Sequence, residues 1–329
     1  MPVTIRDVAR LAGVSAMTVS RVANGQEGVA GETRRRVEAA IAELGYVPNG
    51  LARGLISRHT RIVGLVVPDI ANPFFTLVVR GVEEIAWRSG HHLMLCNTRG
   101  DLARERSYIR DMVALRAEGL VVAPVGDRSA PGLQELTRND LPFVLVDRSV
   151  RGKKADLVQG DSIAGARQLV ARLLAEGHRA VAMLTEQSEV STARDRALGY
   201  EQALGAAGIR IRSELVVETS SIDPAGSREA TRRLLALPEP PTAIFAVNNI
   251  AAVGVLEAAR DVGLAVPGEL AVACFDDLGF TAGFGPQLTV LAQPAETFGT
   301  IAMQLLLDRI SGDETGPGRT VVLPGELLI

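Results

Sequence analysis

The chain has 329 residues, of which 47% are hydrophobic and 22% charged; this composition is typical of a globular protein with large cores, and the length suggests about two or three domains. No apolar run is long enough to cross a membrane and no signal-peptide pattern precedes the first motif, which argues against a membrane protein and against an exported solute-binding protein. Taken alone, the formal net charge of −3 argues against a nucleic-acid-binding protein.

Residues 4–25, TIRDVARLAGVSAMTVSRVANG, have the pattern of two short helices joined by a tight turn. Thr4 is a candidate N-cap of the first helix. The residues that follow at helical spacing form one small apolar face: Ile5, Val8, Ala9 and Ala12. Gly13 ends this helix, and Ser15 is placed to cap a second one. The spacing therefore predicts a helix-turn-helix.

The second predicted helix turns Val19 and Val22 toward the first helix and leaves the opposite face exposed. The exposed face carries Ala16, Met17, Ser20, Arg21 and Asn24. Small and polar residues with an arginine fit the major groove of DNA and can reach base edges. From the spacing alone, an ordinary helical hairpin with a solvated face remains the alternative. The charge distribution favours DNA, because residues 1–60 carry a net charge of +3 and the remainder −6.

The segment at 49–60 joins this unit to the rest of the chain. A helix there would be short, and Gly50 and Gly54 would each destabilise it by about 1 kcal/mol relative to alanine. We therefore expect it to be disordered away from DNA and to fold on DNA. By itself the segment is typical of an interdomain linker. Next to a DNA-binding unit, Leu55 is better explained as an apolar wedge between base pairs in the minor groove.

From about residue 61 the pattern changes to alternating strands and helices. Apolar, strand-like runs at 61–67, 91–97, 119–124 and 143–147 alternate with helix-like segments near 74–89, 101–117 and 129–139. The pattern repeats with strands at 179–185, 214–219, 242–248 and 270–276 and helices near 162–176, 194–207, 225–236 and 250–262. Apolar strands separated by helices predict parallel sheets covered on both faces, and the two series predict two similar α/β subdomains.

Ligands bind such sheets beyond the carboxyl ends of the strands. The polar residues at or just after predicted strand ends are Asp69, Asn97, Asp147, Asp161, Asn248 and Asp276. Cys96 and Cys274 lie within apolar runs, so we expect buried thiols rather than a disulfide, and a cytoplasmic location.

The first motif and its continuation, VAGETRRRVEAAIAELGYVPNGLARGL, resemble the headpiece of the lactose-repressor and purine-repressor family of bacterial transcription regulators. The resemblance continues through RIVGLVVPDIANPFF, FVLVDR, GDSIAGA, RDRALGY, AVNN, CFDD and LTVLAQP, in the family's order. It implies an all-α headpiece at 1–48, a hinge helix or linker at 49–60 and a periplasmic-binding-protein-like α/β body at 61–329. In such a body the chain crosses between the subdomains near 160, 290 and 320. The N-subdomain is then expected at about 61–160 and 291–320, and the C-subdomain at about 161–290 and 321–329.

The resemblance also implies which headpiece residues contact DNA. The residues expected to contact bases are Ala16, Met17, Arg21 and, from the hinge, Leu55. The residues expected to contact the DNA backbone are Thr4, Ser15, Thr18, Ser20, Asn24 and Thr33. Hydroxyls and amides position a protein on phosphates, whereas Arg21 can pair with a guanine through two hydrogen bonds.

For a small-molecule effector the resemblance implies Phe74, Phe75, Asp147, Arg148, Arg196, Asn248, Asp276 and Gln293. Arginine donors, carboxylate acceptors and aromatic faces suit a polyhydroxylated ligand. Each residue also has a structural explanation: the aspartates can cap loops, Arg196 can pair with Asp195 or Glu201, and the phenylalanines can belong to the core. Asp161 is better explained as a helix N-cap than as a ligand contact.

The chain departs from the family pattern at two places. Asn248-Asn249 stands where the family usually has Asn-Asp, so an acidic group is missing from the pocket region or its cap. Pro224 stands where some sugar-binding members carry an aromatic residue, and Trp87 is expected to be a packing residue. The sequence therefore does not choose among a sugar, a sugar acid, a nucleoside and a phosphorylated metabolite.

The expected function is that of a sequence-specific transcriptional regulator, a repressor, whose affinity for double-stranded DNA is controlled by a small-molecule effector such as a sugar. A homodimer on a pseudo-palindromic operator is expected, with Leu278, Phe280 and Phe284 near the dimer contact. The alternatives are control by a protein partner and action as an activator. Enzyme motifs such as G-x-S-x-G and H-E-x-x-H do not occur, and the histidines form no metal-ligand spacing with the cysteines, so no enzyme, metal or cofactor is expected.

Overall fold

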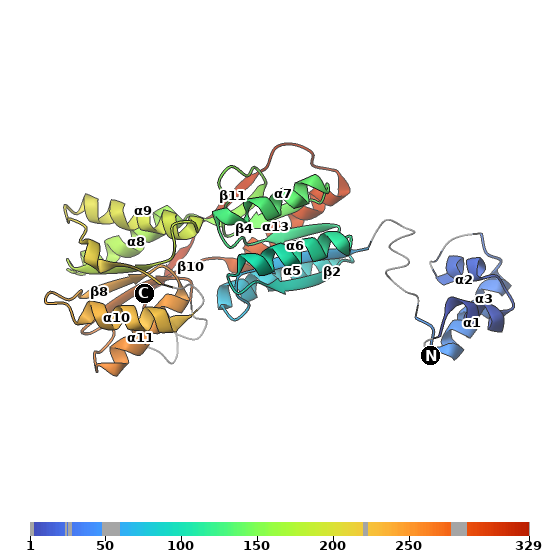
Figure 1. Ribbon diagram of the computed structural model, residues 1–329, viewed down its shortest axis with the longest axis horizontal. Helices are drawn as coiled ribbons and strands as arrows, with labels where there is room; N and C mark the ends of the chain where they lie inside the picture. Colours follow the sequence, from blue (N-terminus) through green and yellow to red (C-terminus); the bar gives the residue numbers. More distant parts are fainter. Residues whose placement is uncertain are drawn as a thin grey trace. The chain divides into compact units, whose positions relative to one another are not determined.

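The computed structural model describes residues 3–23, 25, 28–47, 60–219, 223–277 and 288–328. The chain divides into two compact units, at 1–61 and 62–329, which we call the headpiece and the body (Figure 1). The expected hinge at 49–60, with Leu55, lies outside the described residues except for Thr60. Asn24 and the expected dimer residues Leu278, Phe280 and Phe284 also lie outside them.

In its described residues the headpiece contains three helices, α1 (Ile5–Ala12), α2 (Ala16–Ala23) and α3 (Gly31–Leu44). As predicted, Thr4 is the N-cap of α1, and it forms a capping box with Asp7. Gly13 ends α1 in the left-handed conformation with φ of 64°, and the Ser15 hydroxyl accepts from the backbone N–H of Thr18 at 3.1 Å. One side chain from each helix fills the centre of this unit at 0% exposure: Val8, Val19 and Val37. The helix-turn-helix is therefore present as a packed three-helix unit.

The body contains two six-stranded sheets, one in each subdomain (Figure 1). The first has the order β11-β5-β4-β3-β1-β2. Its strands are β1 (Ile62–Val67), β2 (His92–Asn97), β3 (Gly119–Val122), β4 (Phe143–Val146), β5 (Asp156–Gly160) and β11 (Thr320–Leu323). The helices of this subdomain are α5 (Pro73–Arg88), α6 (Leu102–Ala114), α7 (Ala130–Arg138) and α13 (Ala295–Ser311), with the short 3-10 turn η1 (Asp127–Ser129).

The second sheet has the order β12-β10-β9-β8-β6-β7, in which the antiparallel β12 is at one edge. Its strands are β6 (Val181–Thr185), β7 (Val216–Glu218), β8 (Ala243–Ala246), β9 (Ala271–Phe275), β10 (Thr289–Ala292) and β12 (Glu326–Leu328). The helices among the described residues of this subdomain are α8 (Ser162–Ala175), α9 (Ser191–Ala206), α10 (Pro224–Leu235) and α11 (Asn249–Asp261), with the 3-10 turn η2 (Ser213–Leu215).

Both faces of each sheet are buried, which explains why the strands are almost continuously apolar. In the first sheet, Val63 and Leu65 on β1 pack with residues of α5 and α13 on one face. Val66 on the same strand packs with residues of α6 and α7 on the other face. Two similar subdomains of parallel strands covered by helices were predicted from the alternating pattern, and this prediction is confirmed.

The chain crosses between the subdomains after β5, after β10 and after β11. Leu291 pairs with Phe275 in the second sheet, and Leu323 pairs with Gly160 in the first. The boundaries expected near 290 and 320 were therefore a few residues too early, because 291–292 belong to the second subdomain and 321–323 to the first. Strand pairing sets these boundaries, and single-sequence patterns do not show strand pairing.

The structure also tests what the sequence predicted for Trp87, for the two cysteines and for membrane-spanning helices. Trp87 was expected to pack, but it is 73% exposed on α5, because Val78, Val82 and Ala86 form the buried face of this helix. Cys96 and Cys274 are buried free thiols, as expected. In the described part of the chain, no helix has the length and apolar character needed to span a bilayer.

Candidate functional site

Several of the predicted DNA-contacting residues lie at helix N-termini of the headpiece, whereas Arg21 lies in the last turn of α2. Met17, in the first turn of α2, is 68% exposed, and Arg21 is exposed on the same helix. Ser15 caps α2, and its hydroxyl lies 2.9 Å from the hydroxyl of Thr18. Thr33 lies in the first turn of α3. Backbone N–H groups at helix N-termini attract anions such as phosphates, so this arrangement suits contact with a DNA backbone.

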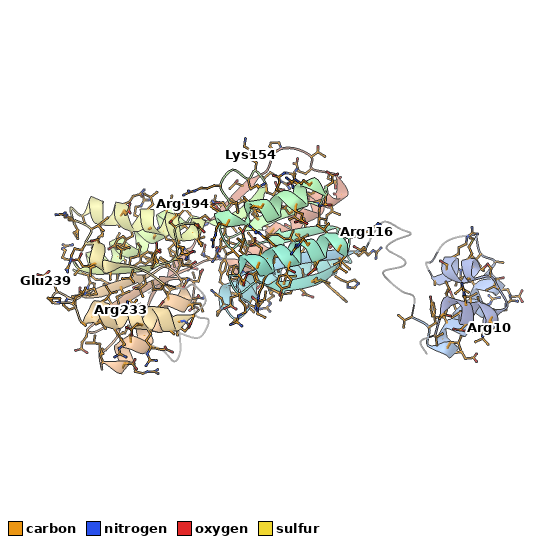
Figure 2. All side chains as sticks on the ribbon, in the orientation of Figure 1. Arg10, Arg116, Lys154, Arg194, Arg233 and Glu239 are labelled. Carbon is orange, nitrogen blue, oxygen red and sulfur yellow. The ribbon has the colours of Figure 1, made fainter. Side chains whose placement is uncertain are left out.

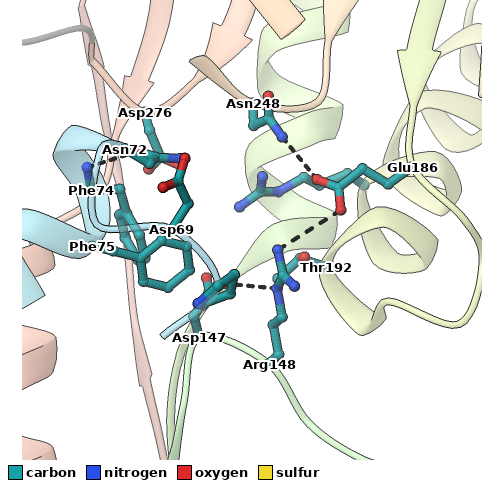
Figure 3. A pocket seen from close by; sticks show the side chains of 12 residues that line it. Asp69, Asn72, Phe74, Phe75, Asp147, Arg148, Glu186, Thr192, Asn248 and Asp276 are labelled. Carbon is teal, nitrogen blue, oxygen red and sulfur yellow. Dashed lines mark hydrogen bonds and ion pairs between the residues drawn. The ribbon is translucent and has the colours of Figure 1, made fainter. Parts of the chain in front are cut away.

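A pocket with an empty volume of about 390 Å³, open solvent at its mouth included, lies between the two subdomains of the body (Figure 3). Its lining from the first subdomain is Pro68, Asp69, Asn72, Phe74, Phe75, Asp147 and Arg148. Its lining from the second subdomain is Glu186, Thr192, Arg196, Asn248 and Asp276. Most of these residues directly follow a strand or begin a helix, so the carboxyl ends of both sheets face the pocket, as expected for parallel sheets.

Seven of the eight predicted effector residues line this pocket. The eighth, Gln293, is not part of the lining, but its side-chain amide donates to Asp276 Oδ1 at 2.8 Å. Gln293 therefore holds the Asp276 carboxylate in place from the segment that crosses between the subdomains. Asp161 caps α8 by accepting from the Ala164 N–H at 2.9 Å, in agreement with its structural interpretation.

Glu186 is the centre of a polar network that joins the two subdomains (Figure 3). Its Oε1 accepts from Asn248 Nδ2 at 2.8 Å, while Asn248 Oδ1 accepts from the Ala251 N–H and caps α11. On the opposite side, Arg148 Nη2 lies 3.8 Å from Glu186 Oε2, and Arg148 Nε lies 3.4 Å from Asp147 Oδ2. Arg148 of the first subdomain is thus paired with Glu186 of the second.

Arg196 is held by an aromatic ring rather than by a carboxylate of its own helix. Its guanidinium carbon lies 3.9 Å from the centre of the Phe275 ring, and its Nη1 donates to the backbone carbonyl of Val247. Among the described residues, neither Asp195 nor Glu201, the two partners considered from the sequence, forms an ion pair with Arg196. Its buried Nε has no hydrogen-bond partner among the described residues, and the ring and the carbonyl fix the guanidinium at the pocket wall.

Asp147 and Asp276 occupy matching positions, each directly after a strand of its sheet. Both have a positive φ, 65° for Asp147 and 66° for Asp276, and both are 6% exposed. Burial raises the pKa of the Asp147 carboxyl, and burial raises the pKa of Asp276 to about 6 even though Arg196 and Gln293 favour its charged form. Strained backbone and perturbed carboxyl groups in a cleft are features of ligand-binding sites.

Five lining residues were not predicted from the sequence as ligand contacts, although Asp69 was recognised as a strand-end residue. The missed residues are Pro68, Asp69, Asn72, Glu186 and Thr192. Glu186 follows β6 directly, as Asp147 follows β4, so the same strand-end rule would have found it. Asn72 and Thr192 lie at the N-termini of α5 and α9, and only the packing of the two subdomains brings them to the pocket.

The departure at Asn249 lies beside the pocket rather than in its lining. Asn249 is the first residue of α11 and is 0% exposed, and its Nδ2 donates to Asn72 Oδ1 at 3.0 Å. The cap of α11 is Asn248.

Two family models match the chain. Residues 4–49 match the model described as bacterial regulatory proteins, lacI family, and residues 170–329 match a periplasmic binding protein-like domain. The chain is 34% identical over 327 residues to the HTH-type transcriptional repressor PurR of Photobacterium profundum, covering 99% of this chain and 97% of the relative. It is 35% identical over 309 residues to the ribose operon repressor of Escherichia coli K12, covering 94% of this chain and 93% of that relative.

Solved structures of transcription regulators also match this chain over nearly its whole length. The structure of the lac repressor dimer bound to operator and the anti-inducer ONPF matches with a TM-score of 0.84 at 27% identity, covering 100% of this chain and 98% of the other. The complex of the transcriptional regulator CelR with cellobiose matches with a TM-score of 0.74 at 31% identity, covering 99% of this chain and 98% of the other.

Proposed function

Since the chain belongs to the LacI family of bacterial regulatory proteins and is a transcriptional repressor of that family, we propose that its affinity for an operator is set by a small-molecule effector bound between the two body subdomains. The expectation that it is not an enzyme is confirmed by the relatives, which are named transcriptional repressors. Cytoplasmic location is part of the same proposal, because the protein must reach its operator.

The observation that supports an effector pocket is the position of Arg196. A buried arginine fixed over Phe275 lines the pocket together with carboxylates that come from both subdomains. A ligand that accepts from Arg196 and donates to Asp147 and Asp276 would contact both halves of the body at once. Because such a ligand interacts with both subdomains, it favours one relative orientation of them.

The charges of the lining narrow the class of ligand. Four carboxylates, Asp69, Asp147, Glu186 and Asp276, face the pocket with two arginines, Arg148 and Arg196. An added phosphate or carboxylate would increase this negative charge, whereas hydroxyl groups can donate to the carboxylates and accept from Arg196. We therefore propose a compact, neutral, polyhydroxylated effector, a sugar, rather than a sugar acid or a phosphorylated metabolite. The names of two matches, the ribose operon repressor and the CelR–cellobiose complex, agree with this class.

A matched pair of ligands tests this proposal. The melting temperature of the full chain is measured with D-ribose and with D-ribose 5-phosphate, and then with a panel of other neutral sugars, nucleosides and sugar acids. We expect a neutral sugar to raise the melting temperature in proportion to its concentration, and its phosphorylated form to have a much smaller effect. Stabilisation by an anionic metabolite alone would contradict the proposed class. No response to any small molecule would favour the alternative of a protein partner.

The headpiece part of the proposal assigns base contacts to Ala16, Met17, Arg21 and Leu55. The backbone contacts proposed with them are Thr4, Ser15, Thr18, Ser20, Asn24 and Thr33. The exposure of Met17 and Arg21 on α2 supports their assignment. Selection of bound sites from random duplexes tests it, and we expect the recovered sites to be pseudo-palindromic, as a symmetric dimer requires.

The homodimer has support from an apolar surface of the first subdomain. Trp87 is 73% exposed and Leu77 is 40% exposed on α5, and Leu95 is 41% exposed on the neighbouring edge strand β2. Exposed large apolar residues on adjacent elements are typical of protein interfaces. Sedimentation of the full chain tests this proposal: Trp87→Glu should shift the dimer toward monomer, whereas the same charge at an exposed polar position such as Gln202 should not.

A further inference from the structure

The described parts of the two subdomains contact each other directly on two sides of the pocket. One side has several contacts close together: Arg194, which is labelled in Figure 2, lies 3.3 Å from Asp127, and Arg128 lies 3.0 Å from Glu189. The Ser149 N–H also donates to Ser191 Oγ at 2.9 Å there. The other contact joins the N-termini of α5 and α11 through Asn72 and Asn249.

The Asn72–Asn249 contact is buried and directional. Asn249 is 0% exposed and Asn72 is 7% exposed. Asn72 Oδ1 accepts from two donors: the Phe74 N–H at 2.9 Å, which caps α5, and Asn249 Nδ2 at 3.0 Å. Asn249 Nδ2 also lies 3.4 Å from the backbone oxygen of Asp277. A single oxygen therefore connects the N-terminus of a helix in one subdomain to the first residue of a helix in the other.

The orientation of the Asn249 amide is determined by these neighbours. Its Nδ2 faces two oxygens, and its Oδ1 has no hydrogen-bond partner among the described residues. Reversing the amide would place Oδ1 against Asn72 Oδ1 and the Asp277 carbonyl, which are both acceptors. In this chain position 249 thus supplies a donor to Asn72 Oδ1, and with Asn72 held in this orientation a carboxylate at 249 would face two oxygens away from water.

The residues on either side of this contact line the pocket. Asn248 precedes Asn249 and lines the pocket from the second subdomain, while Phe74 and Phe75 follow Asn72 and line it from the first. We propose that Asn249 is a positioning residue: its hydrogen bond to Asn72 sets the angle between the subdomains and so holds the two walls of the pocket at ligand-binding separation. The effect on effector affinity rests on the function proposed above, whereas the effect on the angle does not.

The effect of Asn249 on the angle between the two subdomains is tested without any ligand. Spin labels are attached to the full chain at Arg138→Cys on α7 and Gln202→Cys on α9, two exposed positions in different subdomains. The native thiols are buried, and burial raises the pKa of Cys96 to about 11, so labelling at the new cysteines is favoured. Labelled chain is diluted with unlabelled chain, and the distance distribution is measured by pulsed electron resonance.

We expect Asn249→Asp to shift and broaden the distribution. The matched control is Thr231→Val, which removes a fully buried side-chain hydrogen bond, to the Ser227 carbonyl, inside the second subdomain, and should leave the distribution unchanged. If Asn249→Asp fails to fold, Asn249→Ala removes the same donor without adding a charge and should show the shift. A distribution identical to that of the parent chain in the folded Asn249 variant would overturn the proposal.

A second measurement connects the angle to binding. With D-ribose as the probe, we expect Asn249→Asp to weaken affinity by about tenfold, as for the loss of a buried hydrogen bond, and Thr231→Val to leave it unchanged. If the parent chain does not bind D-ribose, the neutral sugar that raises its melting temperature most is the probe instead; if no neutral sugar binds, the proposed effector class fails, while the distance measurement still decides the role of Asn249. A shifted distance with unchanged D-ribose affinity would overturn the link between the angle and the pocket.

Discussion

The headpiece and the body pocket display their functional side chains in opposite ways. In the headpiece, Met17 and Arg21 project from α2 into solvent. In the pocket, Asp147, Arg196 and Asp276 are each at most 6% exposed and are held by other side chains. A substitution in the headpiece therefore removes one contact, whereas a substitution in the pocket also leaves its former partners buried and unpaired. Effects in the pocket should accordingly be larger and depend on pH, and effects in the headpiece should be smaller and depend on salt.

The largest expected effect is that of Asp276→Ala. The substitution removes an acceptor from the pocket and leaves Gln293 Nε2 without its partner at 2.8 Å. We expect affinity for the sugar effector to fall by about 100-fold, or about 3 kcal/mol, which is the scale for losing hydrogen bonds to a charged group. Operator affinity without effector should stay nearly unchanged.

Fluorescence anisotropy of labelled operator, titrated with effector, measures both quantities. Asp223→Ala is the matched control, because Asp223 caps α10 and does not line the pocket. If Asp276→Ala responds at the normal effector concentration, the effector does not bind where we propose.

The second prediction concerns pH. Burial raises the pKa of Asp276 to about 6, above the value of about 3.9 for an unfolded chain. The protonated carboxyl is thus favoured by folding, so its contribution to stability is complete below pH 4 and is lost as the pH rises to about 6. We expect this loss to be up to about 3 kcal/mol. Asp276→Asn, which cannot ionise, should lose less stability than the parent over this range.

Urea unfolding of parent and variant at several pH values between 4 and 7 measures the difference. Subtracting the two curves removes the contributions of groups that do not interact with Asp276, such as Glu105, whose pKa is also raised by burial. Parallel curves would show that Asp276 does not titrate in this range.

The third prediction concerns the exposed DNA-contacting face of the headpiece. Arg21→Ala should reduce affinity for the selected operator by about 1–3 kcal/mol and affinity for random DNA much less, because base contacts discriminate among sequences. Equal losses on the two duplexes would show that Arg21 contacts phosphates only. Repeating the titration at several salt concentrations sharpens the comparison, since a phosphate contact changes the salt dependence of binding as well.

The smallest expected effect is that of Asp161→Ala. Asp161 lies after β5 where the chain first crosses between subdomains, yet its carboxylate accepts from the Ala164 N–H and caps α8. We expect a loss of about 1 kcal/mol in the free energy of unfolding, with unchanged effector affinity. Thermal unfolding and effector titration on the same sample check this, and weaker effector binding would assign Asp161 to the pocket.

The sequence by itself determined the local structure. Gly13 and Ser15 predict where α1 ends and α2 begins, since a left-handed turn and an N-cap depend on residues close in the chain. The alternation of apolar runs and helical segments predicts two parallel sheets, because strands buried on both faces must be apolar throughout. The strand-end rule placed Asp147, Asn248 and Asp276 at the sheet edge where they lie.

Only the tertiary structure decided which of these groups meet. The subdomain crossings follow β10 and β11, because pairing of Leu291 with Phe275 and of Leu323 with Gly160 assigns these strands to their sheets. Arg196 rests over Phe275 rather than pairing along its own helix, and Asn249 donates to Asn72 across the subdomain boundary. Such contacts join residues far apart in the chain, so their partners are fixed by packing and burial, which no local pattern records.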